Sequence, residues 1–178
     1  GIFECVFCGT VTTRDYVANE ANSGNLDHLG IAIVAEGNRE RLYLPPDLSQ
    51  SDMQIPEIDD RGLCAALSPN PRDVWCRNFG LYSPKDLFTR RQLLALSTFS
   101  ELIALARDQL ICDGANEEYA DSVSTYLAFT VSRTCDFNNS LCRWAPDNQK
   151  LMNLFSRQAI PMVWDYCEAN VMRPVVGG

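Results

Sequence analysis

A capping box followed by a long apolar repeat is the feature that most constrains the fold of this chain. Thr89 and Gln92 have the spacing at which two side chains satisfy each other's free backbone N–H groups at a helix start. Apolar residues then recur every three or four positions, and Gly114 is placed to end the helix. The repeat consists of Leu96, Phe99, Ile103, Ala106 and Leu110. It predicts one long helix, preceded by a further helix start at Ser83-Pro84.

Two more helices are predicted after this one. The first spans about Glu117 to Phe137. The second spans about Gln149 to Glu168, and we expect Pro161 to kink or break it because proline removes a backbone donor. The predicted inner face of the Glu117–Phe137 helix holds Tyr119, Val123, Tyr126 or Leu127, Thr130 and Val131.

The N-terminal part of the chain has a different pattern. Residues up to about 45 are typical of strands and turns, with β-type runs over Ile31–Ala35 and Arg41–Leu44. Residues 47–82 are rich in proline and acidic side chains and predict an irregular connector. The predicted order is therefore a β-rich part (1–46), a connector (47–82) and a helical domain (83–178), an α+β fold that is mainly α. Packing of Leu63, Trp75, Phe79 and Tyr82 is expected to order the connector.

Charge and hydropathy narrow the range of functions. The 178 residues carry a net charge of −8, which opposes the phosphate backbone and argues against a free-standing nucleic-acid binder. However, 13 of the 15 basic residues are Arg, the side chain best suited to bidentate phosphate contacts. The sequence has no apolar run long enough for a membrane span and no signal peptide at its start, so no membrane partner is expected.

Eight cysteines are present, and only Cys5 and Cys8 are closely spaced. We interpret the other six as mostly buried, reduced thiols of a cytoplasmic protein. Cys5-Val6-Phe7-Cys8-Gly9 has the spacing of a zinc-binding turn, but a closed zinc site needs four ligands. Three interpretations stay open: half of a site whose other half lies upstream, a complete site with Cys64, Cys76 or His28, or a turn without metal.

A second group of candidate residues is polar and lies at the predicted helix ends. Arg90 and Arg91 open the long helix, where a phosphate contact and a solvated first turn are both plausible. Asn139, Arg143 and Trp144 occupy a polar turn whose Arg–Trp pair could stack on a base, anchor a partner or simply pack on the fold. Arg157 is a further candidate contact. No catalytic residue is assigned, because the sequence has neither a phosphate loop nor a nucleophile motif, and His28 is interpreted as a turn residue.

Several ordered motifs resemble one family, the zinc-ribbon-containing adenine-specific DNA methylases of bacteria and archaea. The similarity is carried by Leu87–Phe99, Tyr119–Phe129, Asn138–Trp144 and Arg157–Asp165, preceded by Ile33–Gly37 and Tyr43–Pro46. Cys5-Val6-Phe7-Cys8-Gly9 resembles the second cysteine pair of the family's zinc ribbon. The family's Gly-rich cofactor motif and its Asp-Pro-Pro-Tyr motif do not occur in this sequence.

The resemblance implies an insertion domain that lies between those two motifs in an S-adenosylmethionine-dependent DNA amino-methyltransferase. Such a domain is expected to be inactive alone, to hold half a zinc site at Cys5 and Cys8, and to leave the methyl donor to the catalytic domain of the parent chain. Its expected partners are that catalytic domain and DNA, through Arg90, Arg91, Asn139, Arg143, Trp144 and Arg157. Two alternatives remain: a protein-interaction module without nucleic-acid contact, and a metalloenzyme using Cys5, Cys8 and His28.

Overall fold

The computed structural model describes residues 2–46, 54–70, 72–156 and 158–172. It shows an α+β fold that is mainly α. The strands form three separate antiparallel hairpins: β1 (Ile2–Glu4) with β2 (Val11–Thr13), β3 (Ile33–Glu36) with β4 (Arg41–Leu44), and β5 (Trp144–Ala145) with β6 (Lys150–Leu151). The α-helices are α1 (Arg14–Asn22), α2 (Arg90–Cys112) and α3 (Glu117–Phe137). Three short 3-10 helices lie between them, namely η2 (Arg61–Leu63), η3 (Trp75–Phe79) and η4 (Pro84–Leu87).

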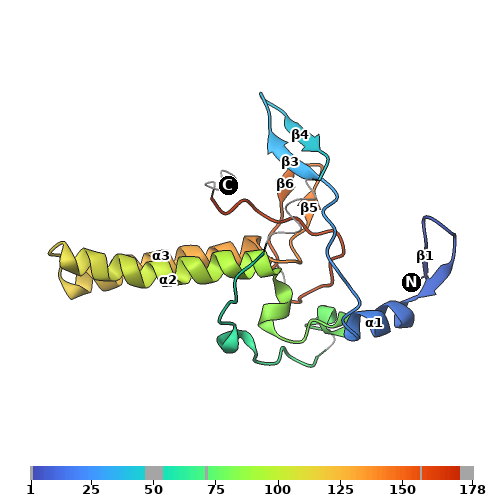
Figure 1. Cartoon of the computed structure of the whole chain (residues 1–178), viewed down its shortest axis with the longest axis horizontal. Helices are drawn as coiled ribbons and strands as arrows, with labels where there is room; N and C mark the ends of the chain where they lie inside the picture. Colours follow the sequence, from blue (N-terminus) through green and yellow to red (C-terminus); the bar gives the residue numbers. More distant parts are fainter. Residues whose placement is uncertain (1, 47–53, 71, 157, 173–178) are drawn as a thin grey trace.

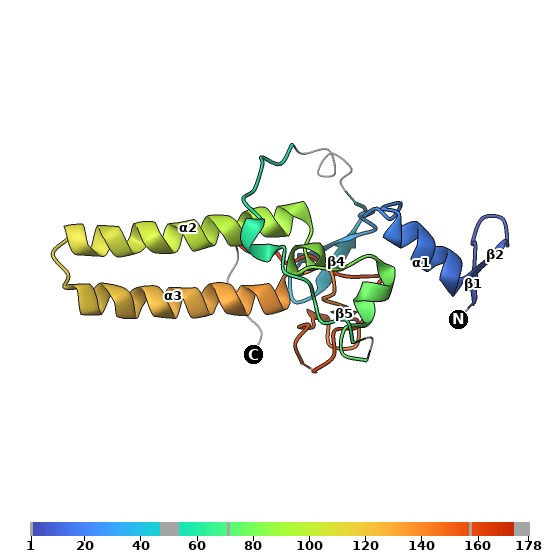
Figure 2. The same cartoon turned by 90° about the horizontal axis from the view of Figure 1, so that it is seen from below.

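Helices α2 and α3 form a long antiparallel arm that extends away from the rest of the molecule (Figures 1 and 2). The predicted capping box is present: the Thr89 hydroxyl accepts from the Gln92 N–H, and the Gln92 side chain accepts from the Thr89 N–H. Helix α3 begins at a second cap, where the Asn116 side chain accepts from the Tyr119 N–H. The prediction of both helices is therefore confirmed, with α2 ending at Cys112, two residues before Gly114.

The hydrophobic core lies in the body at the base of this arm, not between the two helices. It is built by residues from four separate segments of the chain: Val74, Cys76, Leu87, Leu141, Cys142 and Leu154. Within the arm itself, α2 buries only Gln92 and Leu96, and α3 buries only Ala120 and Asp136. The arm is thus anchored at one end, and most of its length is exposed to solvent.

The prediction of a third helix after α3 is wrong. Residues 149–156 and 158–168 form β6 and irregular backbone, and several of their N–H and C=O groups bond to distant segments. The Leu154 N–H donates to the Asp136 carbonyl at 3.0 Å, and Cys167 donates to Cys142 at 2.7 Å. Ile160 forms a parallel bridge with Val74. These tertiary pairings outweigh the helical period of the sequence in this segment.

The N-terminal part also departs from the prediction. The two predicted β-type runs form the β3–β4 hairpin, with Glu36 paired to Arg41. However, a helix that was not predicted from the sequence follows β2. This helix, α1, is capped by the Thr13 side chain and packs on η3. The contact is close, because a Cβ at Gly80 would lie 2.8 Å from the Ala21 carbonyl oxygen. Glycine also suits the Gly80 φ of +86°.

The connector is only partly as predicted. Part of it, residues 47–53, lies outside the described residues. Of the four side chains expected to order it, Phe79 is buried at 4% exposure, whereas Leu63, Trp75 and Tyr82 lie at the surface. Among the described helices, none is both long enough and apolar enough to cross a membrane.

Candidate contact surface at the base of the arm

The polar turn after α3 is a structural element of the body. Asn139 is fully buried; its amide donates to the Cys135 carbonyl at 2.9 Å and its side-chain oxygen accepts from the Leu141 N–H at 3.0 Å. Ser140 donates from its hydroxyl to the Leu87 carbonyl at 2.9 Å. The predicted contact role of Asn139 is therefore corrected: its side chain holds the turn together and presents no surface to a partner.

Asp136 organises the same turn from its other side. Its carboxylate accepts from the Phe155 N–H at 2.7 Å, from the Asn153 amide at 2.9 Å and from Arg133 at 2.9 Å. The Asp136 side chain thus joins the end of α3 to the segment that follows β6. A buried carboxylate needs hydrogen-bond donors, and the turn supplies them.

Arg91 is held by the segment near the C-terminal end of the described chain. Its guanidinium forms a bidentate pair with Glu168, with two N–O distances of 3.0 Å. The hydrogen bonds to Glu168 raise the pKa of Arg91 above its ordinary value. A phosphate group would have to compete with this carboxylate for the guanidinium.

Arg90 is exposed and donates to the Pro56 carbonyl at 3.4 Å. Because this single contact to a neutral acceptor leaves most donors of the guanidinium in solvent, Arg90 keeps its capacity to bind an anion. The first turn of α2 therefore holds one arginine that is paired and one that is accessible.

Arg143 and Trp144 lie where three segments of the body meet. The Trp144 Nε1–H donates to the Tyr43 hydroxyl at 3.3 Å, and the two rings pack edge to face with centroids 6.4 Å apart. Tyr43 belongs to β4, so this contact joins the β3–β4 hairpin to β5 (Figure 1). Arg143, the residue before Trp144, is exposed, and its guanidinium forms no ion pair with any residue that the structure describes.

The sequence reading missed Tyr43 and Glu168 as members of this surface. The alternation of polar and apolar residues around Tyr43 predicted a strand and no contact role. No local pattern links Glu168 to Arg91, which are 77 positions apart. Arg157, the last candidate contact, lies outside the described residues.

Cys5 and Cys8 lie in the turn of the β1–β2 hairpin. The turn is closed by hydrogen bonds from the Gly9 N–H to the Cys5 carbonyl (2.8 Å) and from the Cys5 N–H to the Thr10 carbonyl (3.0 Å). Gly9 has a φ of +68°, the left-handed conformation that glycine adopts most easily. The Cys8 thiol donates to the Thr10 hydroxyl at 3.2 Å. Its hydrogen bonding with Thr10, and to a smaller extent with Cys5, lowers the pKa of Cys8 and favours the thiolate that a metal requires.

These residues fit half of a zinc site. Two sulfur ligands lie on a tight turn, and a closed tetrahedral site needs two more. No group of three or more His, Cys, Asp or Glu side chains in the described ranges is placed to hold a metal ion. The interpretation that Cys64, Cys76 or His28 completes the site is therefore not supported within those ranges.

His28 instead contacts Tyr166 near the base of the arm. The His28 Nδ1 and the Tyr166 hydroxyl are 3.0 Å apart, and their rings meet edge to face. Burial raises the pKa of Tyr166 to about 12, so this hydroxyl stays protonated at neutral pH. The contact fastens the extended segment before β3 to the C-terminal part of the body, which is a structural role.

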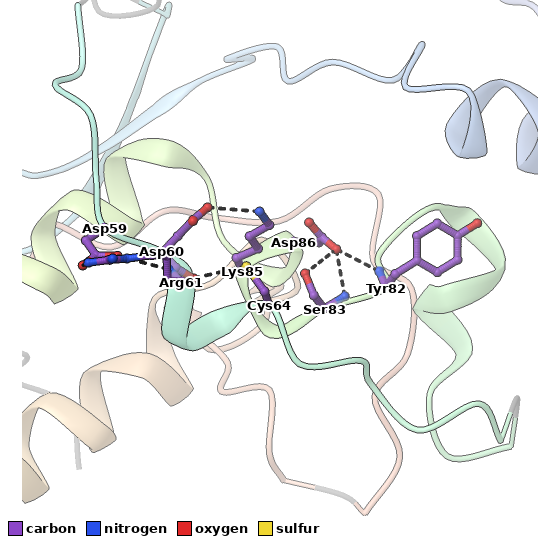
Figure 3. Close-up of polar contacts among 8 residues, drawn as sticks. All are labelled: Asp59, Asp60, Arg61, Cys64, Tyr82, Ser83, Lys85 and Asp86. Atoms are coloured by element: carbon purple, nitrogen blue, oxygen red, sulfur yellow. Dashed lines mark hydrogen bonds and ion pairs between the residues drawn. The ribbon is translucent and has the colours of Figure 1, made fainter.

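A second polar cluster lies on the connector side of α2 (Figure 3). Asp86 caps η4 by accepting from the N–H groups of Tyr82 and Ser83 at 2.9 and 2.8 Å. Lys85 pairs with Asp60 at 3.1 Å, and the hydrogen bond raises the pKa of Lys85. Further drawn contacts are the Arg61–Asp59 ion pair and the Cys64 thiol, which donates to the Asp60 carbonyl at 3.5 Å, so the drawn contacts of this cluster hold the connector to η4.

Comparisons with known proteins found no match: no family model, no curated protein and no solved structure is significantly similar to this chain.

Proposed function

We propose that this chain is the insertion domain of an S-adenosylmethionine-dependent DNA amino-methyltransferase, and that it helps to position DNA or braces the catalytic domain. In this proposal the domain does not catalyse methyl transfer itself. The motif resemblance supports the family, and the observation that carries the contact role is the exposed Arg143, whose neighbour in the chain, Trp144, packs on Tyr43. Such a combination of a cation and an aromatic ring suits a phosphate with its neighbouring base, or an acidic partner surface.

The distribution of charge supports a contact at the base of the arm and not along it. Residues 98–125, at the tip of the arm, contain one arginine and six carboxylates. This end of the arm repels DNA phosphates. Arg90 begins α2 at the other end of the arm, and Arg143 lies in the body directly before β5 (Figure 1). We therefore expect DNA, if bound, to lie near the base of the arm.

The cofactors follow from the same proposal. Cys5 and Cys8 would provide two thiolates of a zinc ribbon whose other ligands belong to the parent protein. The methyl donor would bind to the catalytic domain of the parent, and the protein would act in the cytoplasm of a prokaryote.

Fluorescence anisotropy with a labelled DNA duplex, repeated from 20 to 300 mM salt, tests the DNA-binding form of the proposal. We expect weak binding, because only a few phosphates are contacted, and an affinity that falls as the salt concentration rises, because each contacted phosphate releases counterions. A parallel assay with a radiolabelled methyl donor should show no transfer above the protein-free control. Methyl transfer by this chain alone would contradict the proposal.

A second candidate function is a protein-interaction module without nucleic-acid contact. The net charge of −8 and the pairing of Arg91 with Glu168 favour it. The same titration separates the two functions, since this candidate predicts no measurable DNA affinity even at 20 mM salt.

A further inference from the structure

One side of the arm carries exposed apolar residues that nothing in the described chain covers. Leu102, Tyr119 and Tyr126 are 48%, 58% and 74% exposed, although all three are large hydrophobic residues. Tyr119 and Tyr126 are seven residues apart and therefore lie on the same side of α3. Phe99 and Val123 are only partly buried next to them. These five residues are called the apolar arm face below.

The two helices contribute to this face at the same level. The Arg107–Asp121 ion pair, at 2.6 Å, fixes the antiparallel register of α2 against α3. Counting back along α2 and forward along α3 from this pair brings Leu102 level with Tyr126, near the middle of the arm. Small or polar residues occupy the other side of the arm, namely Ser97, Ser100, Ala104, Ser124 and Ala128.

We propose that the apolar arm face binds the same face of a second copy of this chain, with the two arms antiparallel. This inference does not depend on the proposed function, because Arg143 and Trp144 lie outside the arm. A two-fold axis passing near Leu102 and Tyr126 brings each of these side chains close to its own copy and closes the assembly as a dimer. The result is a four-helix bundle, the usual way in which helices with one apolar side exclude water.

The size of the face is sufficient for a specific dimer. A helix of 23 residues is about 34 Å long, and two packed helices are about 20 Å wide. One face of the arm therefore offers about 700 Å² per copy, close to the roughly 800 Å² per partner of a standard interface.

The charges favour the antiparallel orientation. The tip of the arm carries Asp108, Asp113, Glu117 and Glu118, whereas the base carries Arg90 and Arg133. Antiparallel arms place the acidic tip of one copy against the arginines of the other, and parallel arms would place two acidic tips together. The Arg133 side chain remains 64% exposed in its pair with Asp136, so it can still interact with a second carboxylate.

Sedimentation equilibrium on the full chain, over 1 to 200 μM, tests the association. We expect a reversible dimer. Leu102→Glu should weaken it by more than about tenfold, since a carboxylate would be buried opposite its own copy. Ala104→Glu adds the same charge two residues away on the other side of the arm, and it should change the affinity less than about twofold. Circular dichroism should show equal helicity for the variants, which excludes unfolding as the cause.

Cross-linking tests the orientation. Leu102→Cys should form a 102–102 disulfide between copies under mild oxidation, identified by peptide mapping. The native Cys112, which is exposed at the tip, should form no 112–112 disulfide, because antiparallel tips point apart. A chain that stays monomeric at 200 μM, a dimer insensitive to Leu102→Glu, or a 112–112 product would each overturn the proposal.

Discussion

Two residue types, buried amides and carboxylates, connect the arm to the body. Gln92 donates to the Asn138 side-chain oxygen at 3.3 Å, and the same oxygen accepts from the Ala169 N–H at 3.2 Å. Asn138 thereby links the start of α2, the end of α3 and the segment that carries Glu168. Individual polar side chains, and not a large apolar interface, therefore set the position of the arm on the body.

Replacing Asn139 should affect stability and not binding. In Asn139→Ala, the buried Leu141 N–H and Cys135 carbonyl lose their partners, which costs about 2–4 kcal/mol of unfolding free energy. Urea denaturation followed by circular dichroism measures this loss. A variant as stable as the wild-type chain would contradict the assigned role of Asn139.

The cysteines should differ widely in their reactivity. The pKa of Cys8 is lowered by Thr10, whereas burial raises the pKa of Cys142 to about 11 and that of Cys167 to about 12. Iodoacetamide at pH 7.5 should therefore alkylate Cys8 long before the other two, because the thiolate is the nucleophile. Mass spectrometry over time measures the order, and Thr10→Val should slow the reaction at Cys8. Faster alkylation of Cys142 than of Cys8 would contradict the assignment.

At the scale of elements, local sequence signals determined the arm and failed elsewhere. Thr89, Gln92 and Asn116 act within four residues of themselves, so both long helices could be predicted from the sequence. By contrast, residues 149–168 pair with Asp73, Asp136 and Cys142, which lie far away along the chain. Helical periodicity does not detect such long-range backbone bonds, and for the same reason the burial of Asn139 was not foreseen.

The capping box at the start of α2 gives a prediction for one element. Thr89→Ala removes the side-chain acceptor of the Gln92 N–H and should lower the unfolding free energy by about 1 kcal/mol. Thr89→Ser keeps the hydroxyl and serves as the matched control. Chemical denaturation of both variants provides the measurement, and equal loss in the two would show that the cap is not the cause.

At the scale of the whole molecule, two buried thiols and one half-buried thiol should make the folded state less stable at alkaline pH. Burial raises the pKa of Cys76 and Cys142 from 9.0 to about 11 and that of Cys167 from 9.0 to about 12. The unfolded chain therefore loses these protons first, near pH 9, while the folded chain keeps them. Stability should be unaffected by these thiols below about pH 8 and should fall from about pH 9 upward.

Urea midpoints measured between pH 7 and 10.5 test this dependence. Cys167→Ala removes one of the three groups, so its stability should fall less steeply with pH than that of the wild-type chain. Parallel curves for the two proteins would contradict the role of the buried thiols.

In the proposed function DNA lies near the base of the arm, and Arg143 provides the most direct test. DNA-duplex affinity is measured by anisotropy for the wild-type chain, Arg143→Ala and Arg107→Ala; the two variants carry the same change in charge, one at the base and one near the tip. We predict that Arg143→Ala weakens binding several-fold and reduces the slope of log affinity against log salt by about 1, while Arg107→Ala leaves both unchanged. Equal effects of the two substitutions, or no effect of Arg143→Ala on DNA binding, would contradict this prediction.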